Sequence, residues 1–206
     1  MPNQHYYSNQ PVTEHDRRKL ETVLRGSKFT FISDSGVFSK GGVDYGSKVL
    51  IEALEIPSRS HVLDVGCGYG PIGLSAARLA NEGHVTMIDI NSRAIELAKE
   101  NAELNGISNV TIVESDLFAA VQGQQFDIVI SNPPIRAGKE TVHKIFEQAY
   151  EHLKDGGELW IVIQKKQGSP SAKAKLESLF SRVEEVTKDK GYRIFKAVKT
   201  SSQKSE

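Results

Sequence analysis

One stretch limits the possible fold of this chain more than any other: residues 61–73, which read HVLDVGCGYGPIG. Its apolar start is short, β-branched and followed at once by glycine, as expected of a strand buried on both faces. Gly66, Gly68 and Gly70 then alternate with other residues, so the backbone can take positive φ and leave room for a ligand. Pro71 suits the first turn of a helix. The stretch therefore predicts a strand, a glycine loop and a helix around a nucleotide-sized crevice.

Two cofactor classes use such a loop, and the spacing helps to separate them. A dinucleotide site expects G-x-G-x-x-G from the end of the strand, but counting from Gly66 places Pro71 at the third glycine position. A frame shifted to Gly68 restores that pattern and leaves two extra residues after the strand. Methyltransferases place an acidic residue in the strand before G-x-G-x-G, and Asp64 with Gly66, Gly68 and Gly70 fits without a shift. The loop therefore favours S-adenosyl-L-methionine over NAD.

Composition indicates one ordinary globular domain. The chain has 206 residues, of which 38% are hydrophobic and 25% charged, and a domain of this size buries a sizeable core. Cys67 is the only cysteine, so no internal disulfide is possible and a reducing cytoplasm is the expected location. The longest apolar run, residues 159–163, is too short to span a bilayer, and we expect no membrane partner.

The net charge is zero, but the charges are unevenly placed along the chain. Residues 61–130 contain 3 basic and 9 acidic side chains, whereas residues 131–206 contain 15 and 10. The half with the glycine loop is therefore acidic, and the half after it is suited to an anionic substrate. Solvated helix faces that happen to differ in charge are the alternative explanation.

The hydrophobic pattern predicts four regions. Residues 1–16 are polar and expected to be mobile, as is the polar tail, residues 200–206. Residues 17–57 are predicted to form a hairpin around Gly26-Ser27, then a glycine-rich loop and a helix over 47–54 that can act as a lid. Residues 58–199 are predicted to be the cofactor-binding catalytic domain.

Strands and helices alternate through that domain. Strands are predicted at 62–65, 85–88, 110–113, 126–130, 159–163, 183–187 and 192–198, with helices at 71–79, from Ser92 to a stop at Gly106, at 139–153 (ended by Gly156-Gly157) and at 171–180. Alternation implies parallel strands with right-handed crossovers. The turn at Gly191 is too short for a crossover, so the last two strands must be antiparallel. We therefore predict an α/β fold: a doubly wound, seven-stranded, mostly parallel Rossmann-like sheet whose last strand is antiparallel.

Four polar residues, Asp64, Asp89, Asp116 and Asn132, lie in or at the ends of the first four predicted strands of this sheet. In an open α/β sheet, ligands bind beyond the carboxyl ends of the strands, so these residues should line one site. Asp89 follows the glycine loop by about twenty residues, where a carboxylate can accept both ribose hydroxyls of a nucleotide. Alternatively, Asp89 serves only to cap the helix that follows.

The other acidic residues of the predicted site have separate roles. Asp116 is placed to accept from an adenine amino group, with Leu117 as apolar cover, although an aspartate after a strand is often only a turn residue. Ile90, which follows Asp89, is also predicted to bind the cofactor. Asp64 lies inside its strand, where an unpaired charge is costly, so it should face backbone donors or the ammonium group of the cofactor.

The tetrapeptide Asn132-Pro133-Pro134-Ile135 is the most informative about chemistry. Each proline lacks a backbone donor, and the residue before a proline is held extended, so the remaining carbonyls are acceptors of fixed direction. An aromatic amino group is a poor nucleophile because its lone pair is delocalised into the ring. The side-chain oxygen of Asn132 and the carbonyl of Pro133 can bind its two hydrogens and direct that lone pair toward a methyl sulfonium.

With these motifs the chain resembles the class I S-adenosylmethionine-dependent methyltransferases that modify planar amino nitrogens. Within them it is most similar to the RsmC-type family, which methylates guanine N2 of 16S ribosomal RNA, and to its short, single-domain YbxB-like members. The matching segments are SGVFSKGGVDYGSKVLI, DVGCGYGPIG, SDLF and NPPIRAGK. The resemblance implies that Asp64, Gly66, Gly68, Asp89 and Asp116 bind the methyl donor. It also implies that Asn132 and its two prolines hold the target base.

The resemblance implies an RNA partner, the small ribosomal subunit or its 16S rRNA, for a monomer or weak homodimer. Ile135 departs from the family, which usually has Phe or Tyr there, and Phe38, Tyr45 or Tyr69 is the candidate for stacking on a base instead. Basic side chains available to RNA are Arg136, Lys139, Lys144, Lys165 and Lys166.

The leading hypothesis is an RNA base N-methyltransferase, with guanine N2 preferred over adenine N6. A protein glutamine N5-methyltransferase is an alternative, because an amide nitrogen has the same delocalised lone pair. A binding module that holds S-adenosylmethionine or RNA without turnover, such as a ribosome assembly factor, is another. Cys67 is interpreted as a small loop residue rather than a nucleophile, and the histidines show no spacing typical of metal ligands.

Overall fold

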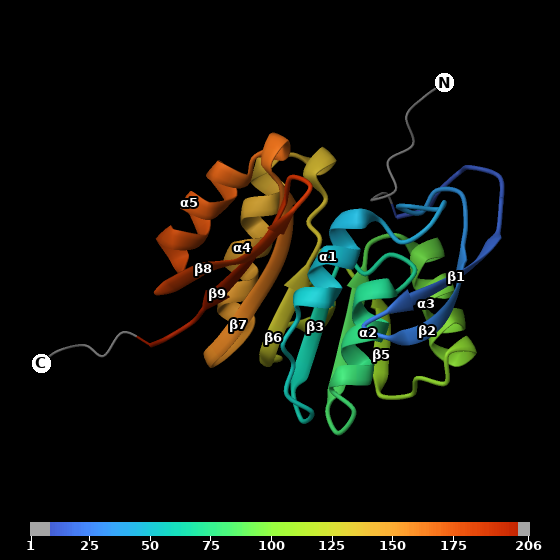
Figure 1. Cartoon of the computed structure of the whole chain (residues 1–206), viewed down its shortest axis with the longest axis horizontal. Helices are drawn as coiled ribbons and strands as arrows, with labels where there is room; N and C mark the ends of the chain where they lie inside the picture. Colours follow the sequence, from blue (N-terminus) through green and yellow to red (C-terminus); the bar gives the residue numbers. More distant parts are fainter. Residues whose placement is uncertain (1–8, 202–206) are drawn as a thin grey trace, which may run out of the picture.

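The computed structural model describes residues 9–201, and Figure 1 shows a central sheet with helices on both of its faces. The strands are β1 (Arg18–Leu24), β2 (Ser27–Ser33), β3 (His61–Val65), β4 (His84–Asp89), β5 (Val110–Glu114), β6 (Phe126–Ser131), β7 (Leu153–Gln164), β8 (Arg182–Asp189) and β9 (Tyr192–Val198). The α-helices are α1 (Tyr45–Ala53), α2 (Pro71–Leu79), α3 (Ser92–Leu104), α4 (Lys139–His152) and α5 (Ser169–Leu179). Short 3-10 helices are η1 (Ala119–Val121), η2 (Ile135–Ala137) and η3 (Lys165–Gln167).

The main sheet has seven strands in the order β5-β4-β3-β6-β7-β9-β8, which confirms the predicted doubly wound fold. The β5, β4, β3, β6 and β7 strands are parallel to one another, and β9 is antiparallel to both β7 and β8. Strand order reverses beside β3, because β4 lies on one side of it and β6 on the other. A ligand crevice is expected at this switch point.

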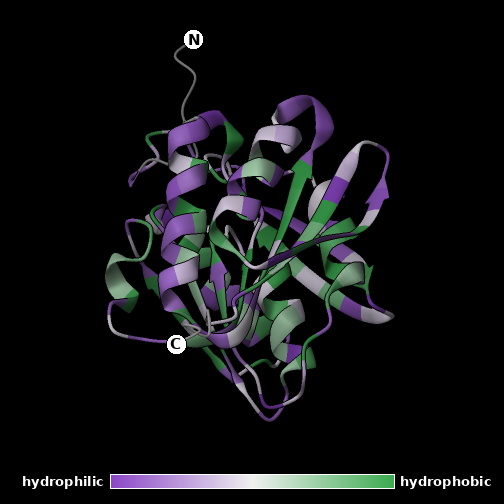
Figure 2. Ribbon diagram, turned by 90° about the vertical axis from the view of Figure 1, so that its left-hand side faces the viewer, coloured by the Kyte–Doolittle hydropathy of each residue, from purple (hydrophilic) through white to green (hydrophobic). Residues whose placement is uncertain are grey.

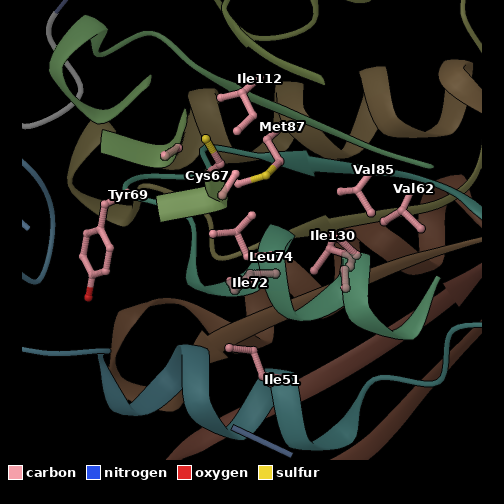
Figure 3. Packing of buried hydrophobic residues seen from close by; sticks show 14 of the residues in the cluster. Ile51, Val62, Cys67, Tyr69, Ile72, Leu74, Val85, Met87, Ile112 and Ile130 are labelled. Carbon is pink, nitrogen blue, oxygen red and sulfur yellow. The ribbon is translucent and has the colours of Figure 1, made fainter. Parts of the chain in front are cut away.

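Alternate residues along the buried strands supply two separate core layers. Val62 and Ile130 pack in the layer covered by α1, α2 and α3, whereas Leu63 and Val129 pack in the layer covered by α4 and α5. Figure 3 shows part of the first layer, with Ile51 of α1 among its labelled side chains. In Figure 2 the central strands are mainly hydrophobic, and hydrophilic residues gather on outer helix faces. Burial on both faces explains why the strand sequences are almost continuously apolar.

The β1 and β2 strands form a separate two-stranded antiparallel sheet that packs beside α3, as Figure 1 shows at the right. The predicted hairpin is confirmed, but its turn is at Arg25-Gly26 and not at Gly26-Ser27, because Leu24 pairs with Ser27. Both turn residues have positive φ, of 50° and 73°, as a two-residue type I′ hairpin turn requires.

Two other local predictions are wrong in detail. Asn91, not Ser92, caps α3, because its Oδ1 accepts from the Ala94 N–H at 3.2 Å. The Gly156-Gly157 pair does not end α4: that helix ends at His152, and both glycines lie inside β7. They form an irregularity in the pairing with β6, where the register shifts between Phe126 and Ile128. Glycine inside a strand often marks such a bulge.

Residues 9–16 run along the N-terminal part of α3. The Arg93 guanidinium donates to the Thr13 carbonyl at 2.9 Å, and the Ser92 N–H donates to the Asn9 carbonyl at 3.0 Å. Predictions for residues 1–8 and 202–206 lie outside the described part of the chain. Within residues 9–201, no helix combines the length and apolar character needed to cross a membrane.

Candidate functional site

A cavity of about 500 Å³ opens at the carboxyl ends of β3, β4, β5 and β6. This volume is typical of sites for small molecules and cofactors. Its walls come from the glycine loop, the turns after β4 and β5, the segment from Asn132 to Ile145, and the loop before α1. Of the four polar residues predicted to line one site, Asp89, Asp116 and Asn132 lie on its wall and Asp64 does not.

Gly66 and Gly68 of the glycine loop line the cavity, with φ of 74° and 56°. A Cβ built on either residue meets no atom within 4 Å, so a side chain there would project into open space. Gly70 does not line the cavity. It precedes α2 with φ of 113°, and a Cβ there would lie 3.1 Å from Leu74, so its requirement for glycine is structural.

Asp89 and Ile90 line the cavity beside the glycine loop. The Asp89 carboxylate accepts from the Gly68 N–H at 2.8 Å and from the Asn91 N–H at 2.9 Å, one bond to each oxygen. Burial raises the pKa of Asp89, while these N–H donors oppose the shift. The carboxylate therefore holds the loop in shape and keeps lone pairs on the cavity side that can accept from a ligand hydroxyl.

Asp64 is fully buried below the glycine loop and does not line the cavity. Neither of its carboxylate oxygens has a hydrogen-bond partner among the described residues. Burial, followed by the charge of Asp89, raises its pKa to about 8. Asp64 is therefore not on the cavity wall, where the ammonium group of a cofactor could contact it directly. Its role in binding the methyl donor stays a prediction.

The turn after β5 brings Asp116 and Leu117 to the cavity wall. Asp116 is exposed, and Leu117 takes φ of 48°, which is uncommon for a residue other than glycine. Ser115 stabilises this turn: its hydroxyl donates to the Leu117 carbonyl at 2.8 Å and accepts from the Ala120 N–H at 2.9 Å. Strained backbone of this kind clusters at ligand sites.

Asn132, Pro133 and Pro134 line the opposite side of the cavity, directly after β6. The Pro134 carbonyl accepts from the Ala137 N–H at 2.9 Å. Among residues 9–201, no donor reaches the Pro133 carbonyl or Asn132 Oδ1. The two acceptors predicted to hold a target amino group are therefore the two that residues 9–201 leave unused.

Ile135 does not line the cavity. Its side chain packs against the core layer below α4, and the neighbouring wall comes from Ala137, Thr141 and Lys144. The assignment of Ile135 to the catalytic residues is therefore not supported by its position.

The three aromatic candidates for stacking differ in position. Phe38 lines the cavity and is 40% exposed, so a ligand in the cavity can reach its ring. Tyr69 also lines the cavity but is only 2% exposed and packs edge-on against Phe31. Tyr45 is not on the cavity wall and contacts Tyr192.

Sequence reasoning missed most of the wall formed by the loop before α1. Besides Phe38, this loop contributes Val37, Ser39, Val43 and Asp44, and α1 contributes Ser47. The glycine-rich composition suggested a lid, but nothing local marked Asp44 as part of the site. The only local signal was indirect: an aspartate just before a helical segment is a common N-cap, and helix N-termini often face ligands.

The donor set fits a nucleoside cofactor with an amino-acid tail. The open faces of Gly66 and Gly68 leave space that any side chain would fill. Asp89 and Asp116 can accept from ribose and adenine, and Ile90 and Leu117 offer apolar contact. All of these residues line the same cavity as Asn132.

Comparison with known proteins identifies the family. The methyltransferase small domain family matches residues 28–196. The uncharacterized protein YbxB of Bacillus subtilis is 57% identical over 95% of this chain and 98% of its own length. Ribosomal RNA small subunit methyltransferase C of Escherichia coli is 31% identical over 95% of this chain but 56% of its own length.

A solved structure agrees with these sequence relatives. The T. thermophilus 16S rRNA N2 G1207 methyltransferase (RsmC), in complex with AdoMet and guanosine, matches with a TM-score of 0.80 and 26% identity. The match covers 92% of this chain and 52% of that one, so this chain spans about half the length of the small-subunit methyltransferases that it matches. The chain belongs to the methyltransferase small domain family and is an S-adenosylmethionine-dependent methyltransferase of the RsmC type.

Proposed function

We propose that the protein methylates an exocyclic amino group of an RNA base, with guanine N2 of 16S ribosomal RNA as the preferred target. The names of two relatives support this proposal, because one is a ribosomal RNA small subunit methyltransferase and the other a 16S rRNA N2 methyltransferase. The small ribosomal subunit or its RNA is accordingly the proposed partner.

The observation that carries the proposal is the pair of unused acceptors beside the cavity. Asn132 Oδ1 and the Pro133 carbonyl accept no hydrogen bond from the described residues, while the Pro134 carbonyl is already paired. Two acceptors match the two hydrogens of an exocyclic amino group. Binding both hydrogens orients the nitrogen lone pair out of conjugation with the ring, which is a contribution from position and electrostatics.

When bound, S-adenosylmethionine supplies a sulfonium methyl group: the N–C bond forms as the C–S bond breaks, the electron pair leaves with sulfur, and the nitrogen releases one proton to water. Gly66, Gly68, Asp89 and Asp116 are the residues that we propose hold it. Asn132 and Pro133 hold the amino group on the opposite wall. No titratable base is required, because the developing positive charge on nitrogen is met by neutral acceptors.

Substitution of Asn132 tests the chemistry. Asn132→Ala should leave the affinity for S-adenosylhomocysteine nearly unchanged and lower kcat for methyl transfer about a hundredfold or more, the loss expected for one preorganised polar group. Affinity is measured by calorimetry, and transfer by the incorporation of labelled methyl into small subunits from cells that lack the enzyme. Full activity in this variant would contradict the proposed role of Asn132.

The methylated product identifies the substrate. Mass spectrometry of nucleosides from the same reaction should contain N2-methylguanosine; N6-methyladenosine would move the target to adenine. Label in protein instead of RNA would favour a glutamine N5-methyltransferase. Tight S-adenosylhomocysteine binding without transfer to any under-modified subunit would favour a binding protein that acts in ribosome assembly.

A further inference from the structure

We propose that Asp44 is a positioning residue that holds the side-chain amide of Asn132 with its carbonyl oxygen facing the reacting amino group. The inference rests on the proposed function, since it gives Asn132 Oδ1 the role of an acceptor for that group. Asp44 lies 88 residues before Asn132 in the chain, in the loop that leads into α1.

The contacts of Asn132 define which way its amide points. Its Nδ2 donates to the two carboxylate oxygens of Asp44 at 3.3 and 3.2 Å and to Ser47 Oγ at 3.0 Å. A carboxylate can only accept, so it can face the nitrogen of an amide but not the oxygen. The reversed amide would place two acceptors against each other beside a charge. Asp44 therefore leaves Asn132 Oδ1 as the atom that faces away and can accept from a ligand.

Asp44 itself is held by the start of α1. Its carboxylate accepts from the Ser47 N–H at 3.0 Å, and its carbonyl accepts from the Lys48 N–H at 3.0 Å, so it is the N-cap of this helix. The helix is seated closely on the sheet, because a Cβ at Gly46 would lie 2.8 Å from the Tyr192 ring. The position of the carboxylate is therefore fixed by the packing of α1 against β9.

Two simpler roles for Asp44 predict different results. If it served only as a helix cap, its replacement would lower stability and would affect the transfer step no more than any other loss of order. Asp44 also lines the cavity, where it could contact the methyl donor. In that case its replacement would weaken S-adenosylhomocysteine binding. A positioning role predicts a loss in kcat while thermal stability and the affinity for S-adenosylhomocysteine are retained.

Asp44→Asn separates these roles. Asparagine is as good an N-cap as aspartate and has the same shape, so the melting temperature should stay close to that of the parent. Its amide group can donate to Asn132 Oδ1, which permits the reversed amide and occupies the acceptor. We expect kcat to fall by about tenfold or more, with the dissociation constant for S-adenosylhomocysteine changed by less than about twofold. Asp44→Ala, which also removes the cap, should lose both kcat and thermal stability.

A double-mutant cycle gives a readout that a purely structural role would not move. In the Asn132→Ala background the group that Asp44 orients is gone, so Asp44→Asn should cause little further loss of kcat. Losses in the two single variants that multiply in the double variant would overturn the proposal, as would weaker S-adenosylhomocysteine binding with kcat retained. Lys48→Gln is the matched control on α1, since this exposed side chain lies outside the cavity wall and should change neither quantity.

The same experiments keep this inference separate from the proposed function. If Asn132→Ala retains full transfer, both the proposed role of Asn132 and the positioning role of Asp44 are refuted. If Asn132→Ala is impaired but Asp44→Asn transfers at the rate of the parent, only the role of Asp44 is refuted. The two outcomes are distinguished in one set of kinetic measurements.

Discussion

Asp64 combines complete burial with a carboxylate that makes no regular hydrogen bond to the described residues, although the nearby Gly73 N–H opposes part of the rise of its pKa. Burial is the main reason that its pKa is raised to about 8, and the charge of Asp89 adds to the effect. The neutral acid is therefore the favoured form of Asp64 in the folded protein at neutral pH. A neutral Asp64 does not place a second negative charge beside Asp89, whose own pKa is also raised by burial.

This shift has a definite effect on stability. The pKa of Asp64 is 3.8 without the protein environment and about 8 in the fold, so between these values the folded state binds more protons than the unfolded state. The contribution of Asp64 to the free energy of unfolding therefore falls as pH rises from about 4 to about 8 and is constant outside that interval.

Asp64→Asn removes the proton equilibrium with little change in shape. The melting temperature of this variant minus that of the parent should increase as pH rises from about 4 to about 8, and then level off. Thermal unfolding of both proteins across this range measures the difference. A difference that does not vary with pH would mean that Asp64 stays ionised in the folded protein. Glu103→Gln, at an exposed carboxylate of α3, is the control.

Single residues also mark the limit of sequence reasoning. Asn132 was predictable because the two prolines after it restrict the backbone and remove donors, which is a local property. Asp44 was not, because its significance comes from a hydrogen bond to a residue 88 positions away. Gly70 was assigned to the site from the spacing of the glycine loop, and Ile135 from its place in the Asn-Pro-Pro-Ile motif. Only the positions of Leu74 and of the core layer below α4 explain why neither residue lines the cavity.

At the scale of elements, α3 completes the hydrogen bonding of β2. The Asn101 side chain accepts from the Ile32 N–H at 2.7 Å and donates to the Ile32 and Tyr69 carbonyls at 3.0 and 2.8 Å. One turn later, the Asn105 side chain accepts from the Thr30 N–H at 3.0 Å and donates to the Thr30 carbonyl at 2.8 Å. The side-chain amides of these two α3 residues thus hydrogen-bond to β2 as a neighbouring strand would. Asn101 also connects the hairpin to the glycine loop through its bond to the Tyr69 carbonyl.

Asn101→Ala should be strongly destabilising. Asn101 is fully buried, and its removal leaves three backbone groups without their partner. At about 1 kcal/mol or more for each buried group, the free energy of unfolding should fall by about 3 kcal/mol, whereas Asn105→Ala should cost about 1 kcal/mol. Urea unfolding measures both. Equal losses in the two variants would contradict this account, because Asn105 is only half-buried.

Elements were predictable where the hydrophobic period is clear. The predicted strands and helices are all present, because burial on two faces gives continuous apolar strands and one-sided burial gives helical stripes. Boundaries were less reliable. The β7 strand is twelve residues long, more than twice the predicted length, and includes the two glycines that were interpreted as a helix stop. Its first residues follow the edge of β6, a tertiary constraint that local sequence does not contain.

At the scale of the whole molecule, the uneven charge of the sequence becomes a difference between two halves of the sheet. The acidic residues 61–130 build β3, β4 and β5, and the basic residues 131–206 build β7, β8 and β9. The cavity lies between these halves, with Asp89 and Asp116 on the acidic side and Lys144 on the other. Exposed Arg136, Lys139, Lys165 and Lys166 extend the basic side at the carboxyl ends of the strands.

If this basic side contacts RNA, neutralising it should weaken binding in a salt-dependent manner. Lys165→Gln with Lys166→Gln should raise KM for the subunit and lower the slope of log KM against log salt by about 1.4–1.8, the amount expected for two phosphate contacts. Affinity for S-adenosylhomocysteine should not change. The measurement is KM for the subunit at several salt concentrations.

The matched control removes the same charge elsewhere. Lys154→Gln with Arg182→Gln changes two exposed residues at the opposite end of the sheet, where Arg182 pairs in register with Val198. This pair should leave both KM and its salt dependence near the parent values. Equal effects of the two double variants would indicate a response to net charge and not to local contact.

The side-chain amides of Asn101 and Asn105 also prevent a further strand from pairing with β2. A strand with unpaired backbone groups is a template for another chain, and such edges are a common route to aggregation. Here β2 pairs with β1 on one side and with Asn101 and Asn105 on the other, so the small sheet cannot grow past α3. Its remaining edge is β1, where exposed Arg18 and Lys19 oppose the approach of a foreign strand.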